Sequence, residues 1–443
     1  MKRYATIIFS FTCATNLLFA QQDVWTIDKC MRYAVEHNFD VRANAISLDN
    51  SRSDYRQAVA SFFPTIGASV SADYSFGRSI DPSTNSYNNL KTFNNSYSLS
   101  ASWTIFAGGQ IVNQFRQAKK QREQSTEKLQ NAKDETALKV MEAYVNLQYY
   151  RALSGITASK LEESRALLGK SRRMKELGMN SAIEVSQAEA QYAEDDYTHT
   201  ATLGQLQTAE LSLKNAMNFP ISDTLRLPDP STELLPFEAA ETNFNEIIDF
   251  ARENNPLARQ ARLNVEISRD AVRQAKGALS PSISLQAGLS DSYYRHIGSA
   301  NNSFRTQMNG NFGQYVGVSM SIPLFNGLSR HTTLQKAKNS ELNAQLEYNR
   351  NLYQLDIDIR QAIVDCDNLV KELDKMERKT ESDSIAYRLA RKKYEEGLMS
   401  FLDMQETANT WFESQAETVR STLTLGIKRR LLEYYRTNII IFE

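Results

Sequence analysis

The chain has 443 residues with a formal net charge of −1, and 23% of its residues are charged. This near-equal number of positive and negative charges excludes the basic surface that nucleic-acid binding requires, and we expect no nucleic-acid partner. The four histidines lack metal-site spacing, and the sequence contains neither a phosphate-binding loop nor a closely spaced cysteine pair. We therefore predict no enzyme, no metal site and no cofactor.

Residues 1–20 have the pattern of a secretory signal peptide. They begin with Lys2 and Arg3, continue through a short apolar run and end at Ala20, a small residue. The run is short for a retained membrane anchor, and no cysteine follows it that could carry a lipid. Beyond it no apolar stretch approaches about 18 residues, so an exported chain of this kind enters a membrane only through strands closed into a barrel.

Two cysteines, Cys30 and Cys366, remain after the predicted cleavage, and both lie in helical patterns. We expect them to be buried as small hydrophobic residues. A disulfide is the alternative in an oxidising compartment, and the pairing of the two thiols stays open at this point.

The chain is an internal duplication. Gly178 and Gly397 lie 219 positions apart, each within a long helical pattern, and the same offset joins Glu184 to Asp403. Self-similarity at a fixed offset indicates a repeated structural unit. A proline-rich segment lies between the two copies. The expected division is a signal peptide over 1–20, a first repeat over 21–220, a linker over 221–241 and a second repeat over 242–443.

Alternating apolar and small polar residues predict two strand hairpins, at about 65–106 and about 282–325. Their strands are long enough to cross a bilayer as tilted strands of ~9–11 residues. Rows of Ser and Gly suit the wall of a water-filled lumen, and apolar rows with Trp and Tyr suit lipid, whereas a soluble sandwich usually exposes Lys and Glu. The residues expected to face lipid are Val70, Leu99, Trp103, Leu285, Val318 and Met320.

Four strands per chain cannot close a membrane barrel, because the smallest closed membrane barrels have about eight strands. An open sheet edge is not tolerated in lipid, where no water can satisfy its backbone groups. The chain is therefore expected to assemble with copies of itself, and three copies would give a barrel of twelve strands.

Long helical patterns without proline follow each hairpin. The first, over about 110–176, would be ~100 Å long at 1.5 Å per residue. Its apolar residues recur three and four apart, which indicates coiled-coil-like packing. Gly178 and Gly397 mark helix reversals, since glycine readily adopts the left-handed conformation that ends a helix. The tips are expected at about 177–182 and 396–401, and the return helices at about 182–218 and 401–436.

The predicted fold class is thus mainly α with a small β part, in which long helical hairpins and four membrane strands are repeated within one chain. These features resemble the TolC family of outer-membrane efflux proteins over the whole mature chain. The resemblance rests on the FPTI and SPSI entries to the hairpins, their WTIFAGG and IPLFNG exits, and the tip phrases LGM with IEV and EGL with LDM.

The resemblance implies a homotrimer in the outer membrane of a Gram-negative bacterium, with a twelve-stranded barrel in lipid and an α-helical tunnel through the periplasm. It implies that the trimer is the exit duct of a tripartite efflux pump or a type I secretion system. The closed tips would open when a periplasmic adaptor, coupled to an inner-membrane transporter, docks there.

The resemblance also implies a periplasmic gate at the tips. In the family an aromatic residue and acids form the constriction, and the matching positions are Tyr394, Asp403 and Glu406, with Glu184 at the first tip. A family example pairs these with an arginine two residues after the tip glycine, where Met399 stands here, so we expect hydrogen bonds and packing to hold this gate. Ordinary helix packing is the alternative for Tyr394, and a solvated helix face is the alternative for the two acids of the second tip.

The exposed apolar tips are the expected docking site of the adaptor, and the residues concerned are Gly178, Met179, Gly397 and Leu398. The alternative function is a periplasmic or surface coiled-coil scaffold without a channel. That alternative shares the helices but leaves the four strands unexplained.

Overall fold

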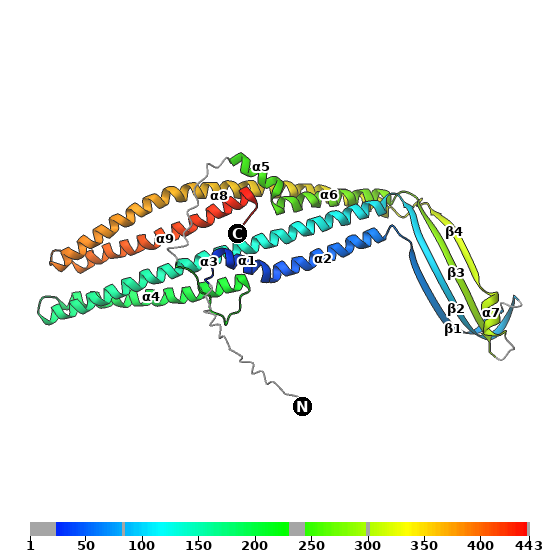
Figure 1. Ribbon diagram of the computed structural model, residues 1–443, viewed down its shortest axis with the longest axis horizontal. Coiled ribbons are helices and arrows are strands. Elements are labelled where there is room, and N and C mark those ends of the chain that lie inside the picture. Colours follow the sequence, from blue (N-terminus) through cyan, green and yellow to red (C-terminus); the bar gives the residue numbers. More distant parts are fainter. Residues whose placement is uncertain (1–23, 82–84, 230–243, 298–301, 441–443) are drawn as a thin grey trace, which may run out of the picture.

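The computed structural model describes residues 24–81, 85–229, 244–297 and 302–440. The predicted signal peptide, over 1–20, and residues 230–241 of the predicted linker lie outside the described residues. The molecule is long and slender, with all described strands at one end and two helical tips at the other (Figure 1).

Both halves of the chain contain, in the same order, two helices, two strands, a helix of 67 residues and a helix that returns from the tip. The second half adds one short helix between its strands. The first repeat consists of α1 (Ile27–His37), α2 (Phe39–Ala60), β1 (Thr65–Asp81), β2 (Ser86–Ala107), α3 (Gln110–Glu176) and α4 (Ala182–Met217). The second consists of α5 (Phe244–Asn254), α6 (Pro256–Gly277), β3 (Ser282–His296), α7 (Phe304–Gly310), β4 (Gly313–Ser321), α8 (Ser329–Glu395) and α9 (Phe401–Thr437). The predicted fold class is confirmed.

The long helices α3 and α8 run most of the length of the helical body and change partners along it. Near the strands, α3 packs against α2 and α6, and α6 packs against α8; towards the tips, α3 packs against α4 and α8 against α9 (Figure 1). Their uninterrupted course follows from the absence of proline between Ser329 and Glu395 and between Gln110 and Glu176, because an internal proline would remove a helix hydrogen bond.

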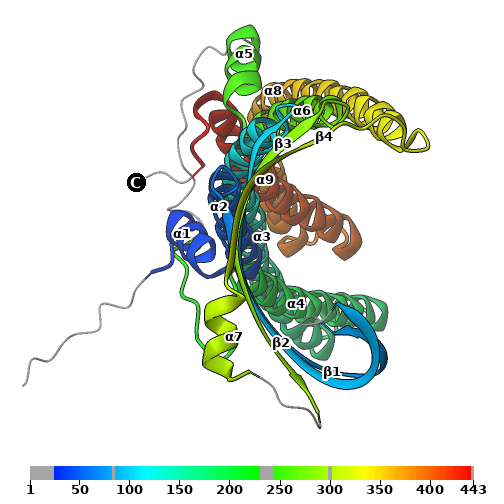
Figure 2. The same cartoon turned by 90° about the vertical axis from the view of Figure 1, so that its right-hand side faces the viewer.

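The four strands form one antiparallel sheet in the order β1-β2-β3-β4, so the hairpins of the two repeats join through β2 and β3. Seen from the strand end, the sheet is curved (Figure 2). The second hairpin differs from expectation in two ways. The helix α7 interrupts it, and β4 ends at Ser321 instead of continuing to 325, because Pro323 has no N–H to donate to a ladder.

The strands meet the helices at a close contact between the repeats. Gly108 has a φ of +60°, and a side chain there would place its Cβ 2.2 Å from the carbonyl oxygen of Gly277 at the end of α6. The reverse contact is as tight, since a Cβ on Gly277 would lie 2.4 Å from the carbonyl oxygen of Gly108. Only glycine fits at either position.

The main hydrophobic core lies at mid-length, where α1, α3, α4 and α9 meet, and includes Met31, Met141, Leu213 and Met217, each at most 1% exposed. Cys30 and Cys366 are buried free thiols, as expected for small hydrophobic residues. None of the helices in the described ranges is both long enough and apolar enough to cross a membrane.

Candidate functional site: the strand sheet and the helical tips

One face of the sheet is apolar over most of the rows that β4 spans, because the strands pair in matching register. Trp103 lies opposite Leu285, which lies opposite Val318. A β-bulge between Thr104 and Phe106 keeps Phe106 on this face, opposite Ile283. All six residues predicted to face lipid share this face, and they are Val70, Leu99, Trp103, Leu285, Val318 and Met320.

The residues of the apolar face remain open to the surroundings of the single chain. Val318 is 69% exposed and Val70 is 68% exposed, although both side chains are apolar. The indole N–H of Trp103 donates to the carbonyl oxygen of Phe62 at 2.8 Å, which ties this face to the chain segment after α2. A contiguous apolar sheet face of this kind requires a non-aqueous partner.

The opposite face is built of small polar residues. The hydroxyl groups of Ser69 and Ser98 lie 2.7 Å apart across β1 and β2, and those of Ser71 and Ser96 lie 2.6 Å apart. On β3 and β4 the ring of Tyr315 lies over the backbone of the opposite residue, Gly288, where a Cβ would come within 2.5 Å of the ring. The sheet therefore separates an apolar surface from a hydrophilic one.

At the other end of the molecule, each helical tip is a tight reversal built on glycine. Gly178 and Gly397 have φ values of +73° and +75°. The N–H of Gly178 donates to the carbonyl of Lys175 at 2.9 Å. The N–H of Met179 donates to the carbonyl of Met174 at 2.8 Å. The second tip has the same pair of bonds, so both α3 and α8 end in a Schellman motif.

A serine starts each return helix and is bonded to one of the predicted gate acids. The N–H of Glu184 donates to the hydroxyl of Ser181, and the side chain of Glu184 accepts from the N–H of Ser181 at 3.3 Å. In the second repeat the hydroxyl of Ser400 donates to Asp403 at 2.7 Å. Glu184 thus completes a capping box, whereas Asp403 bonds the hydroxyl of the serine that caps its helix. The spacing of SAIE and SFLD signals both contacts, although neither was predicted.

Tyr394 lies half-buried between the two tips. Its ring meets that of Phe401 edge-on, with centroids 5.9 Å apart. Burial and the negative charge of Glu184 raise the pKa of its phenol, while a hydrogen bond with Asn180 opposes that shift. This tyrosine of the second repeat therefore contacts polar groups of the first.

The remaining predicted tip residues occupy different environments. Met399 packs against the apolar cluster that joins the two helical hairpins, in which Met404 is fully buried. Glu406 is exposed on α9, one turn beyond Asp403. Met179 and Leu398 protrude into solvent and are 69% and 73% exposed.

A polar connection that local sequence does not predict joins the two repeats a few helical turns from the tips. The hydroxyl of Tyr387 on α8 donates to Glu163 on α3, and the guanidinium of Arg391 lies 3.1 Å from the same carboxylate. Burial, followed by the bond to Glu163, raises the pKa of Tyr387 far above its usual range, so this phenol is neutral and stays a donor at physiological pH. We call these three residues the α3–α8 link.

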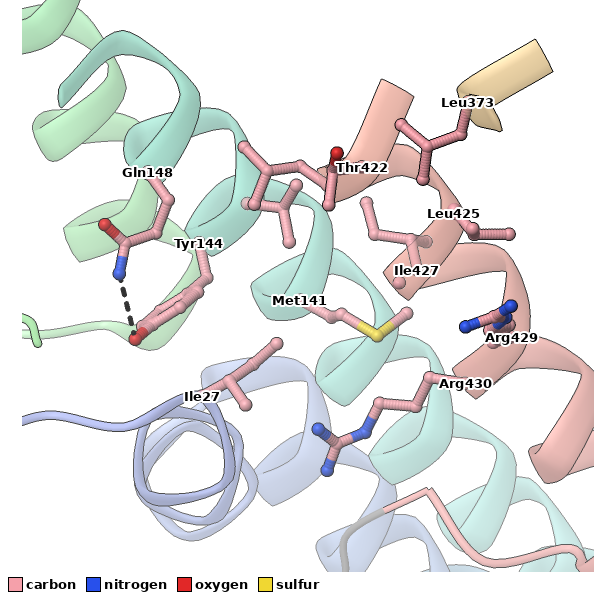
Figure 3. A pocket seen from close by; sticks show the side chains of 13 residues that line it. Ile27, Met141, Tyr144, Gln148, Leu373, Thr422, Leu425, Ile427, Arg429 and Arg430 are labelled. Atoms are coloured by element: carbon pink, nitrogen blue, oxygen red, sulfur yellow. Dashed lines mark hydrogen bonds between the residues drawn. The ribbon is translucent and has the colours of Figure 1, made fainter. Parts of the chain in front are cut away.

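A small pocket at mid-length belongs to the junction between the repeats. Its walls come from α1, α3, α8 and α9 and are mainly apolar (Figure 3). Within it, the amide of Gln148 donates to the hydroxyl of Tyr144 at 3.4 Å, and the guanidinium of Arg430 pairs with Asp28. Among the described residues, no group of three or more His, Cys, Asp or Glu side chains could hold a metal ion.

A sheet with one apolar face, set on helices far longer than a globular core needs, defines a membrane-associated chain with a long helical extension. The sequence model of the family described as "outer membrane efflux protein" matches residues 31–218 and 247–432. The chain belongs to this family, and the two matched segments lie in its two repeats.

The chain is also similar to individual members of known sequence or structure. It is 22% identical over 404 residues to the probable efflux pump outer membrane protein TtgC of Pseudomonas putida, covering 90% of this chain and 80% of that protein. Among solved structures it resembles the Campylobacter jejuni CmeC outer membrane channel, with a TM-score of 0.82 and 17% identity over 94% of this chain and 87% of that one. The Vibrio cholerae outer membrane protein VceC gives a TM-score of 0.77 and 16% identity over 93% and 95%.

Proposed function

We propose that this chain is the outer-membrane exit duct of a tripartite efflux pump or a type I secretion system. Three copies would close a barrel of twelve strands in the outer membrane, with the helices continuing as a tunnel into the periplasm. The observation that carries the proposal is the sheet itself, which has one apolar face, one hydrophilic face and two open edges.

The dimensions of the sheet support this assembly. The shortest strand, β4, has nine residues, which matches the ~9–11 residues of a tilted membrane strand. The outer edges of β1 and β4 have no strand partner within the described sheet. In lipid such edges must be paired, and joining β1 of one copy to β4 of the next would pair both.

An exposed apolar stripe on α8 supports the same assembly. Leu342, Leu346, Tyr353, Ile357 and Val364 are between 43% and 68% exposed and recur at spacings of four and seven. An eleven-residue period keeps a stripe on one side of a nearly straight helix. On α4, Ile183, Tyr197 and Leu211 recur every fourteen residues and are also more than half exposed. We propose that stripes of this kind are covered by neighbouring copies.

The tips are the proposed gate and docking region. Tyr394, Asp403, Glu406 and Glu184 would form the constriction, with Tyr394 bridging the repeats of one copy and the acids ringing the axis. The exposed apolar side chains beside Gly178 and Gly397, namely Met179 and Leu398, would receive the periplasmic adaptor and, through it, the inner-membrane transporter. Support for docking comes from their exposure and from their distance from the strands (Figure 1).

The test is extraction of the protein from outer membranes with detergent, followed by mass measurement and recording in planar bilayers. We expect the wild-type protein to be a trimer that conducts ions weakly. A coiled-coil scaffold would instead be found without detergent and would form no conducting species.

A further inference from the structure

The apolar face of the sheet ends at a definite row. Strand β4 begins at Gly313, opposite Ser290. In the next row on the apolar face, Asp291 stands opposite Tyr97, and it is the one carboxylate on this face among the described residues of the sheet. Beyond this row only β1, β2 and β3 continue, together with α7.

Aromatic rings follow immediately above that boundary. Tyr74 and Phe93 are opposite each other, with ring centroids 4.9 Å apart. The ring of Tyr293 packs on Phe304 of α7 at 5.2 Å, which places α7 against the same face. Aromatic belts of this kind mark the boundary between hydrocarbon and headgroups in membrane barrels.

Three cations are interleaved with these rings on the same face. Arg295 lies opposite Phe93, and Lys91 lies opposite Phe76. Arg78 is two residues further along β1, with its guanidinium carbon 5.3 Å from the ring centre of Tyr87. All three are exposed, and no described carboxylate forms an ion pair with any of them. We call Arg78, Lys91 and Arg295 the cationic rows.

We propose that the cationic rows bind the phosphate groups of a phosphorylated glycolipid in the outer leaflet. This inference rests on the proposed function, because it requires the sheet to lie in the outer membrane. The apolar band would contact the acyl chains, the aromatic rings would lie at the boundary, and the cations would reach the headgroup. Each Lys or Arg held at an anionic lipid surface strengthens binding about fivefold.

The extent of the cationic rows favours a tall, sugar-based headgroup over a glycerophospholipid. From Tyr74 to Arg78 the strand advances four residues, or ~13 Å at ~3.3 Å per residue. With a strand tilt of ~35–45°, this length corresponds to ~9–11 Å along the membrane normal. The headgroup layer of a simple bilayer is only ~5–7.5 Å deep on each side, half the difference between ~30 Å of hydrocarbon and ~40–45 Å in total. A phosphorylated oligosaccharide could contact all three cations and also stack against the exposed rings.

The test uses the purified trimer in neutral detergent, titrated with rough-type lipopolysaccharide, with the same glycolipid after dephosphorylation, and with phosphatidylglycerol. The triple variant R78Q/K91Q/R295Q removes the cationic rows. The matched control R116Q/K119Q/K128Q removes the same charge from exposed positions on α3. We expect the cationic-row variant to bind phosphorylated glycolipid about a hundredfold more weakly than wild type, and the control to bind like wild type.

A double cycle, which combines the cationic-row variant with removal of the phosphates from the glycolipid, tests whether the cations bind those phosphates. Dephosphorylated glycolipid should bind wild type and the cationic-row variant equally weakly. An unchanged affinity of that variant for phosphorylated glycolipid would overturn the proposal, and so would phosphatidylglycerol binding as tightly as the glycolipid. In either case a trimer that still conducts in neutral bilayers would leave the proposed channel function intact, whereas a chain that never inserts would contradict that function.

Discussion

The substitution Val318→Lys places a charge near the middle of the proposed lipid-facing surface. Val318 is the sixth residue of the nine-residue strand β4, it is 69% exposed, and it completes the row of Leu285 and Trp103. A lysine on the lipid face near the bilayer midplane costs ~2–4 kcal/mol per chain, which corresponds to roughly a 30- to 800-fold loss in the folding equilibrium. Because each of three copies carries the change, insertion of the trimer should be strongly impaired.

The neighbouring substitution Ser319→Lys is the matched control. Ser319 lies at almost the same depth but on the opposite face, across from Ser284, where a lysine would reach water in the lumen. Denaturant unfolding from lipid vesicles measures both variants, followed by tryptophan fluorescence, to which Trp103 in the row of Val318 contributes. Equal losses of stability in the two variants would refute the assignment of the faces.

Four further outcomes are expected. Tyr387→Phe removes the hydrogen bond to Glu163 in the α3–α8 link, and a hydrogen bond to a charged group contributes about 1.5–3 kcal/mol. Conductance in planar bilayers should therefore rise severalfold. Unchanged conductance would show that the link does not restrain the tips. Asp403→Asn with Glu406→Gln keeps the helix cap largely intact and should lower cation selectivity; wild-type selectivity would place these acids away from the axis. Leu398→Asp should abolish export in cells while the trimer persists, and continued export would argue against docking at the tips. Burial raises the pKa of Asp134 above its ordinary 3.8, so the folded state binds the carboxyl proton more tightly than the unfolded state does. The stability that comes from this tighter proton binding is lost as pH rises through the raised pKa. Asp134→Asn should therefore stabilise the protein at neutral pH and flatten this part of the pH dependence, which thermal unfolding at several pH values would check.

Features that depend on local sequence were predictable. The long helices lack proline and are bounded by glycine, and the observed α3, Gln110–Glu176, matches the range expected from sequence. The left-handed conformation of Gly178 and Gly397 follows from their place between two helical patterns. The alternation of apolar and small polar residues likewise predicted which strand residues share a face.

Features that depend on long-range contacts were not predictable. Glu163 and Tyr387 are separated by 224 positions, and nothing near either residue indicates the other. The helix α7 was missed because it has seven residues and is fixed by Gln307, whose side-chain amide bonds both backbone groups of Tyr294 on β3. The capping box that Glu184 completes and the bond between Asp403 and Ser400 were likewise not predicted, although both follow from local spacing.

The central claim is that three copies close one barrel by pairing β1 of one chain with β4 of the next. Disulfide formation in outer membranes tests it directly, with Ser69→Cys on β1 combined in turn with Tyr315→Cys, Gly317→Cys or Ser319→Cys on β4. The native Cys30 and Cys366 are buried and provide a low background. The account predicts that at least one pair yields a covalent species of three times the mass of the mature chain. A protein that stays monomeric with every pair, while inserted and oxidised, would contradict it.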